Sequence, residues 1–202
     1  MADLHDISTE ALAAELASRT DLADAAGVMP LSIYQLIEKL SPIPYIDGVA
    51  VRRSNGVAEG MLIRRGTRRF AGRLCSIGGR IRRLESIEQA LRRQFRTDVG
   101  CEIELLVPWN KPVDILQCVP VKEGETPPPD FGPEIGRHCT SQYYPVRLIG
   151  EPKFGNTNFG GQEAAAVEWY RADNLPVEDE FGYGQRSKIL SCIRAAESLL
   201  PS

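Results

Sequence analysis

The sequence has no long apolar run, no basic N-terminus and no closely spaced cysteine pair, and each absence excludes a class of protein. No stretch approaches the roughly 20 apolar residues that a membrane-spanning helix needs. The N-terminus carries Asp3, His5 and Asp6 where a secretory signal would carry lysine or arginine, so we expect a cytoplasmic protein with no membrane contact. The five cysteines are odd in number and form no CxxC pair, which favours buried free thiols over disulfides or zinc.

The chain of 202 residues is long enough for one good core with extensions. Residues 1–28 carry six carboxylates against Arg19 alone, and Ser8 can cap a short helix there. We expect this acidic helical extension to pack on the body or on a second subunit, and residues 29–202 to form one domain. Pro30 opens a second helix, in which apolar residues recur at helical spacing at positions 33, 36, 37 and 40.

The rest of the chain alternates strand-like segments with turns. Strands are expected at 45–53, 60–64, 73–77, 102–109, 113–121, 140–148 and 164–171. Ser54-Asn55-Gly56 predicts a hairpin, and residues 110–112 predict another. Residues 122–137, with three consecutive prolines, and residues 151–162 are expected to be loops. With helices at 85–98 and about 187–200, the pattern predicts an α/β domain with a mixed sheet and no internal repeat.

Residues 78–101 form the most informative stretch, a glycine turn followed by a helix. Ile87, Leu91 and Phe95 recur at i, i+4 and i+8, and Gly100 ends the helix. Gly78 and Gly79 let the backbone approach a ligand closely. Around this stretch, residues 64–96 hold eleven arginines and only two carboxylates, a local charge that favours phosphate groups.

Two other interpretations of the arginines remain open. They can form a solvated face, or pair with acidic residues of the N-terminal segment. Nucleic acid is not expected, because only Phe70 is interleaved with the arginines and the net charge is −3.

The spacing resembles the signature of the Nudix hydrolases: a glycine, five residues, a glutamate, seven residues, then Arg-Glu-apolar-x-Glu-Glu-x-Gly-apolar. Positions that fit or nearly fit are Gly79, Glu85, Arg93, Phe95, Asp98, Gly100 and Cys101. Gln94 and Thr97 stand where the signature has glutamates that help to bind divalent ions, which removes charge from the standard site. The resemblance implies a Nudix-type α/β/α sandwich with a mixed sheet and an N-terminal helical extension.

Residues 34–47 and 61–101 are also similar to the GDP-mannose mannosyl hydrolases, a Nudix branch that itself lacks part of the glutamate set. This resemblance implies a nucleoside diphosphate sugar or another diphosphate ligand, one Mg²⁺ ion (or Mn²⁺), and a homodimer formed through the N-terminal segment. By position it implies diphosphate contacts from Arg64 or Arg65, Arg80 and Arg93. The implied metal ligands are the Asp98 carboxylate and the Gly78 carbonyl.

Two further positions follow from the same resemblance. Asp47 matches an aspartate on the first strand, with a substrate or catalytic role and a buried hydrogen-bonding role both open. Gln142 replaces a family histidine at a substrate contact. Glu85 is expected to order the loop before the helix by accepting from backbone amides.

The general base is the least defined part of the pattern. In the resembling branch a Gln-His pair in a late loop supplies a metal ligand and the base, but here the only histidines are His5 and His138. Counting back from Trp169 without gaps aligns Glu163 and Ala164 with that pair, so that Glu163 is a ligand and no base remains. A shift of one residue aligns Gln162 as metal ligand and Glu163 as base, a role that a carboxylate with a tuned pKa can fill.

Three hypotheses therefore remain from the sequence. The first is a magnesium-dependent hydrolase of a nucleoside diphosphate sugar or a related compound. The second is a Nudix-fold protein that binds such a compound without turning it over. The third is a structural or interaction domain.

Overall fold

The computed structural model describes residues 8–19, 30–66, 70–121, 125, 131–134, 138–153 and 164–201. The helices are α1 (Thr9–Ser18), α2 (Leu31–Leu40), α3 (Ile87–Val99) and α4 (Arg186–Leu199), with a 3-10 turn at Glu178–Glu180. The strands are β1 (Ile43–Ser54), β2 (Val57–Arg65), β3 (Leu74–Cys75), β4 (Ile77–Arg80), β5 (Glu102–Leu105), β6 (Asp114–Pro120), β7 (Phe131–Glu134), β8 (Cys139–Ile149) and β9 (Ala164–Arg171).

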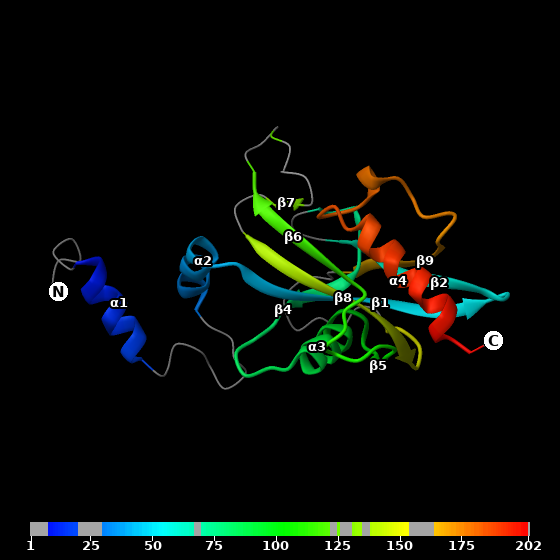
Figure 1. Ribbon diagram of the computed structural model, residues 1–202, viewed down its shortest axis with the longest axis horizontal. Coiled ribbons are helices and arrows are strands. Elements are labelled where there is room, and N and C mark those ends of the chain that lie inside the picture. Colours follow the sequence, from blue (N-terminus) through cyan, green and yellow to red (C-terminus); the bar gives the residue numbers. More distant parts are fainter. Residues whose placement is uncertain are drawn as a thin grey trace.

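The strands form one mixed sheet with β1 and β8 at its centre. Its main path runs β3-β2-β1-β8-β6-β7, while β4 pairs with β1, β5 with β8 and β9 with β2. The β1–β8 and β6–β7 pairs are parallel and the other pairs are antiparallel. Helices α3 and α4 lie on opposite faces (Figure 1), so the predicted α/β/α sandwich with a mixed sheet is confirmed.

Alternation along the central strand divides the core into two layers. On β1, Ile46 and Ala50 pack in one cluster with α3 residues such as Phe95. Val49 and Val51 pack in the other cluster, which includes α4 residues such as Ile193. Because successive side chains of a strand point to opposite faces, odd-numbered residues of β1 face α4 and even-numbered ones face α3. All five cysteines are buried and free, as the sequence predicted.

The first predicted hairpin is confirmed and the second is wrong. Ser54 pairs with Val57, and Asn55 and Gly56 both take positive φ angles (49° and 81°), which a two-residue turn of type I′ requires. The chain around 110–112 does not fold β5 back on β6. Both strands pair instead with β8, β5 along its C-terminal part and β6 along its N-terminal part.

A strand also lies inside the proline-containing segment that was expected to be a loop. β7 pairs in parallel with β6, from Gln117 opposite Phe131 to Pro120 opposite Glu134. The expectation of a continuous loop over 122–137 is therefore wrong at 131–134. A short strand on a sheet edge tolerates proline, since its outer N–H groups need no partner in the sheet.

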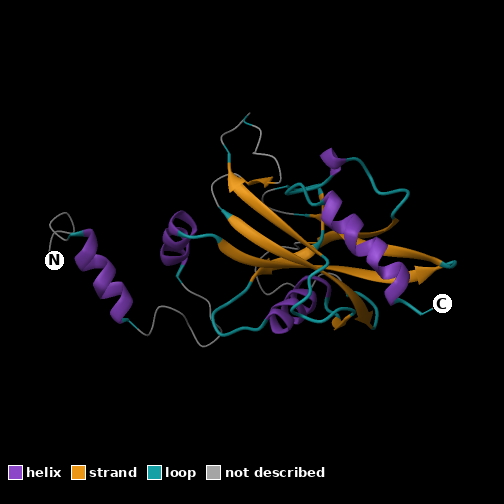
Figure 2. Cartoon of the chain, in the orientation of Figure 1, coloured by secondary structure: helices purple, strands orange, loops and turns teal. Residues whose placement is uncertain are grey.

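The N-terminal helices lie at one end of the molecule, outside the layers that α3 and α4 form on the sheet (Figure 2). α1 lies apart from the sheet, and α2 lies beside the start of β1. None of the ten residues of α2 is buried, and Leu36 and Leu40 are 40% and 75% exposed. The helix predicted after Pro30 is present, but only part of its apolar stripe meets the core, through Tyr34 and Ile37. No helix in the described part of the chain is long and apolar enough to cross a membrane.

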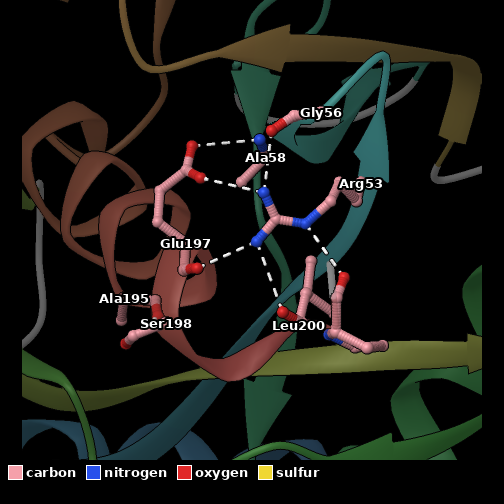
Figure 3. Close-up of polar contacts among 8 residues, drawn as sticks. Arg53, Gly56, Ala58, Ala195, Glu197, Ser198 and Leu200 are labelled. Carbon is pink, nitrogen blue, oxygen red and sulfur yellow. Dashed lines mark hydrogen bonds and ion pairs between the residues drawn. The ribbon is translucent and has the colours of Figure 1, made fainter.

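The C-terminal end of α4 is fixed to the β1–β2 hairpin by Arg53 (Figure 3). Its guanidinium donates to the backbone oxygens of Glu197 (2.9 Å), Leu200 (3.3 Å), Pro201 (3.0 Å) and Gly56 (2.7 Å). The last carbonyls of a helix have no donor within the helix, and Pro201 has no N–H to offer Glu197. The Glu197 carboxylate in turn accepts from the Ala58 amide at 3.0 Å, so helix and hairpin are held from both sides.

Candidate functional site

The loop between β4 and α3 is held in place by one half-buried ion pair. Arg93 donates to both carboxylate oxygens of Glu85, at 2.6 and 2.8 Å, and to the backbone oxygen of Arg80 at 2.9 Å. Glu85 also accepts from the Arg82 amide at 2.9 Å, as the sequence predicted. Ser86 then starts α3 with a reciprocal capping box to Gln89. The residues that match the Nudix signature at 85 and 93 thus build the loop, and Arg93 is engaged within the chain.

β4, the glycine strand, has a side chain packed closely against each of its two glycines. A Cβ placed on Gly79 would lie 1.6 Å from Nε2 of Gln94, so the α3 side chain occupies the space above this glycine. A Cβ on Gly78 would lie 2.3 Å from Oδ1 of Asp47 and 2.4 Å from the Ile46 backbone oxygen. The backbone oxygen of Ile46 explains why position 78 needs glycine, whereas a larger residue at position 79 would displace the end of the Gln94 side chain.

Asp98 lies one turn beyond Gln94 on α3 and is 8% exposed. Residues four apart on a helix share a face, so Asp98 follows Gln94 along the side that meets β4. A negative charge in the last turn of a helix is disfavoured by the helix dipole. A buried carboxylate at this place is therefore suited to a cation.

Asp47 lies on the other face of the sheet, in a closed polar network. It accepts hydrogen bonds from the hydroxyls of Ser76 (2.6 Å) and Ser141, and from Nε2 of Gln185 at 3.5 Å. Burial raises the pKa of Asp47, while the two serine hydrogen bonds and the charge of Arg65 act against that rise. The sheet separates this network around Asp47 from Gln94 on α3.

The buried state of Asp47 predicts a pH dependence of stability. A raised pKa means that the folded chain binds more protons than the unfolded chain from the ordinary value of 3.8 upward. Stability should therefore fall by up to about 1.4 kcal/mol per pH unit as the pH rises through that window. Asp47→Asn, which keeps the shape without the charge, should remove this slope in urea unfolding measured at closely spaced pH values. The exposed Asp173→Asn is the control, and an unchanged slope in Asp47→Asn would contradict the assignment.

The other arginines implied by the resemblance have different partners. Arg64 donates to both oxygens of Glu168 (2.6 and 3.2 Å) and to the Gly72 backbone oxygen. The guanidinium carbon of Arg80 lies 4.3 Å from the centre of the Tyr34 ring in α2. Arg65 lies 5.8 Å from the Tyr183 ring. Arg64 is therefore neutralised within the chain, whereas Arg80 makes no ion pair among the residues that the structure describes.

Four of the arginines in 64–96 pair with acids in the described chain, but not with those of the N-terminal segment that one open interpretation named. The partners are Glu168, Glu85, Glu88 and Glu102, which belong to the same domain and not to the acidic N-terminal segment.

Gln142 lies on the α3 face of the sheet, in register with Ile46, which is itself opposite Gly79. Tyr144 links Gln142 to the turn between β5 and β6. Its hydroxyl lies 2.7 Å from Oε1 of Gln142 and 2.6 Å from the Trp109 backbone oxygen. Burial raises the pKa of Tyr144 to about 12, so the hydroxyl keeps its proton. Among the described residues, the hydrogen bond of the Gln142 side chain is the one that its Oε1 accepts.

The metal site implied by the resemblance is only partly within the described chain. Among the described residues, no group of three or more His, Cys, Asp or Glu side chains could hold a metal ion. Asp98 with a backbone carbonyl suits a single Mg²⁺, which commonly takes one or two carboxylates and completes its shell with water and substrate phosphates. Gln162 and Glu163, the other implied ligands and the implied base, lie outside the described residues.

The structure thus separates the implied residues into groups. Asp47 meets Gly78 on the α4 face, Gln94 and Gln142 lie on the α3 face, and Arg80 stacks on Tyr34 of α2. Sequence reasoning missed Ser76, Ser141 and Tyr34. The serines carry a signal, since a hydroxyl inside an apolar strand needs a partner. Tyr34 carried none, because its place in the apolar stripe of α2 is that of an ordinary core residue.

Comparison with known proteins agrees with this geometry. The family model described as NUDIX domain matches residues 44–190. A possible asymmetric diadenosine tetraphosphate (Ap4A) hydrolase from Jonesia denitrificans is 23% identical, with a TM-score of 0.60 over 81% of this chain and 99% of that one. A MutT NUDIX hydrolase from Burkholderia pseudomallei is 22% identical (TM-score 0.52; 74% and 96% covered).

A third structure, the NUDIX domain of Shewanella oneidensis NrtR in complex with ADP ribose, is 14% identical (TM-score 0.51; 83% and 98% covered). A search of curated proteins found no match. At these identities the structural neighbours support the fold, and the family model spans most of the chain, including the locked loop and α3. The chain belongs to the NUDIX domain family.

Proposed function

We propose that this protein hydrolyses a nucleoside diphosphate derivative, with a nucleoside diphosphate sugar as the favoured substrate and one Mg²⁺ or Mn²⁺ ion as cofactor. The observation that carries the proposal is the packing of α3 against β4, the strand that holds Gly78 and Gly79. The side chain of Gln94 lies against Gly79, and buried Asp98 follows one turn later. An ion held by Asp98 and the Gly78 carbonyl would neutralise a diphosphate at this bend, where the backbone can approach it closely.

The proposal assigns roles to the remaining residues. Arg80 binds the diphosphate, since it directly follows the glycines and makes no ion pair in the described chain. Gln142 donates to the substrate through its N–H groups. Glu163 takes the proton of the attacking water, with Gln162 as a further metal ligand. The exposed Leu31 and Leu40 of α2 support the expected homodimer, because an apolar helix face gains stability when a partner covers it.

The test is product analysis with GDP-mannose, ADP-ribose and Ap4A, with and without Mg²⁺. Free sugar and nucleoside diphosphate would indicate attack on the sugar carbon, and a sugar phosphate with a nucleoside monophosphate would indicate attack on phosphorus. Asp98→Asn should lower Mg²⁺-dependent turnover at least about 100-fold. Glu163→Gln should lower turnover about 100-fold or more while ligand affinity persists. Full activity in Asp98→Asn would refute the metal site.

One observation favours a second function, binding without turnover. Gln94 occupies a glutamate position of the signature, and its neutral amide lies against Gly79 where a carboxylate would carry charge. In that case ligand and Mg²⁺ together should raise the melting temperature, and no product should form from any of the three compounds.

A further inference from the structure

Arg80 is held at the edge of the site by an aromatic pair. Its guanidinium carbon lies 4.3 Å from the centre of the Tyr34 ring, a distance at which a cation is attracted to the ring face. The hydroxyl of Tyr34 lies 3.0 Å from that of Tyr45, which faces Arg80 in the β1–β4 register. Burial, and then the hydrogen bond with Tyr45, raises the pKa of Tyr34 well above its ordinary value, so the ring stays neutral.

The contact leaves one donor of Arg80 with nothing to bind. Nη1 of Arg80 is buried, and among the described residues it has no hydrogen-bond partner. A buried donor without a partner is unfavourable, and a charged one more so. By contrast, the guanidiniums of Arg64 and Arg93 each meet both oxygens of a glutamate. Among the described residues, Arg80 therefore has no carboxylate partner for its charge, and its Nη1 has no hydrogen-bond acceptor.

The ring that holds Arg80 lies in α2, ahead of the residues that the NUDIX family model matches, and α2 is called the added helix below. The family model begins at residue 44, and Tyr34 lies in α2, ahead of it. α2 has no buried residue and meets the core through half-buried Tyr34 and Ile37. α2 lies beside the start of β1 (Figure 1), and the contact of Tyr34 with Arg80 is a main point at which this added helix reaches the domain.

We propose that Tyr34 is a positioning residue, supplied by the added helix, which holds the Arg80 guanidinium ready for an anionic oxygen of a diphosphate ligand. This inference rests on the proposed function. Stacking on a neutral ring favours this orientation of the guanidinium over one that turns to a neighbouring carboxylate, which keeps its charge for a ligand. Fixing the group in advance also lowers the entropy lost when the ligand binds.

The test is calorimetric binding of GDP-mannose and ADP-ribose to the full chain with Mg²⁺. Tyr34→Ala should weaken binding about 2- to 30-fold, the range of a cation–π contact, and Tyr34→Phe should restore most of the loss because it keeps the ring. In an Arg80→Ala background, Tyr34→Ala should cause no further loss. Leu36→Ala, an exposed change on the same helix, is the matched control, and circular dichroism of each variant reports folding.

The outcomes separate this inference from the proposed function. If Arg80→Ala weakens binding and Tyr34→Ala does not, the positioning role is wrong and the diphosphate site stands. Equal losses from Tyr34→Ala with and without Arg80 would show a merely structural role and also overturn the inference. If the unmodified chain binds neither compound, the proposed function fails, and the inference fails with it.

Discussion

Arg53→Ala should lower the free energy of unfolding by about 2–3 kcal/mol, because one side chain supplies the donors for the C-terminal end of α4. Arg53 reaches three backbone oxygens at that helix end and one in the β1–β2 turn (Figure 3). Its side chain is only 22% exposed, so water replaces these bonds incompletely. The positive charge also complements the negative end of the helix dipole.

The measurement is urea unfolding of Arg53→Ala and Arg53→Lys, with Arg52→Ala as the matched control. Lysine keeps the charge but loses the planar fork of donors, so it should recover less than half of the loss. Arg52 is half exposed, pairs with Glu59 and lies 4.0 Å over the Trp169 ring. Its removal should cost no more than about 1 kcal/mol. Equal losses at positions 52 and 53 would show that Arg53 does not fix the helix end.

The sequence predicted well those helices and turns that their own residues specify. α3 has a periodic apolar stripe, a cap at Ser86 and Gly100 in the left-handed conformation at its end, so its position was predictable within two residues. The Asn55-Gly56 turn was predictable for the same reason, since the two residues themselves adopt the required positive φ angles.

Elements that depend on distant partners were not predictable in this way. β7 exists because β6 offers it a free parallel edge, and nothing in its own residues indicates that partner. The turn after Trp109 has hairpin composition, yet β8 is long enough to pair with both flanking strands. The pairing of each strand was decided by the length of β8, which no window around the turn contains.

The sequence was enough to predict which residue types make up the candidate site. It was not enough to predict that these residues lie on two different faces of the sheet. Asp47 and Gly78 match the resembling branch by position, but the register of β1 with β4 and β8 decides that Asp47 points to Ser76 and Ser141. Likewise, the arginine count indicated a phosphate site without showing which guanidiniums are already paired. Those pairings arise between residues as distant as Arg64 and Glu168.

Glu85→Gln should have the second large effect, because it breaks the Glu85–Arg93 ion pair, the lock that holds the loop between β4 and α3. The side chains of Glu85 and Arg93 are 12% and 21% exposed, so the loss leaves a largely buried guanidinium without its counter-ion. We expect a loss of about 2–3 kcal/mol in stability, below the range for fully buried pairs because some water reaches the site. Freed from Glu85, the Arg82 amide should exchange its hydrogen faster.

The pH dependence provides an independent check of this pair. Burial alone would raise the pKa of Glu85, but the hydrogen bond from Arg93 and that from the Arg82 amide outweigh it, and the pKa is lowered. The pair therefore stabilises the fold above the ordinary value of 4.5, and this contribution is lost as the pH falls through the lower, folded-state value. Glu85→Gln should lack that acid-side loss in urea unfolding.

Glu88→Gln is the matched control for the lock, since Glu88 pairs with Arg92 one turn along α3 with 47% of its side chain exposed. A pair of this kind contributes only about 0.5 kcal/mol or less. If Glu85→Gln matched Glu88→Gln in stability and in exchange at Arg82, the loop would owe its shape to the backbone alone. If Glu85→Gln also weakens diphosphate binding and Glu88→Gln does not, the lock acts on the ligand by holding Arg80 and the two glycines in place.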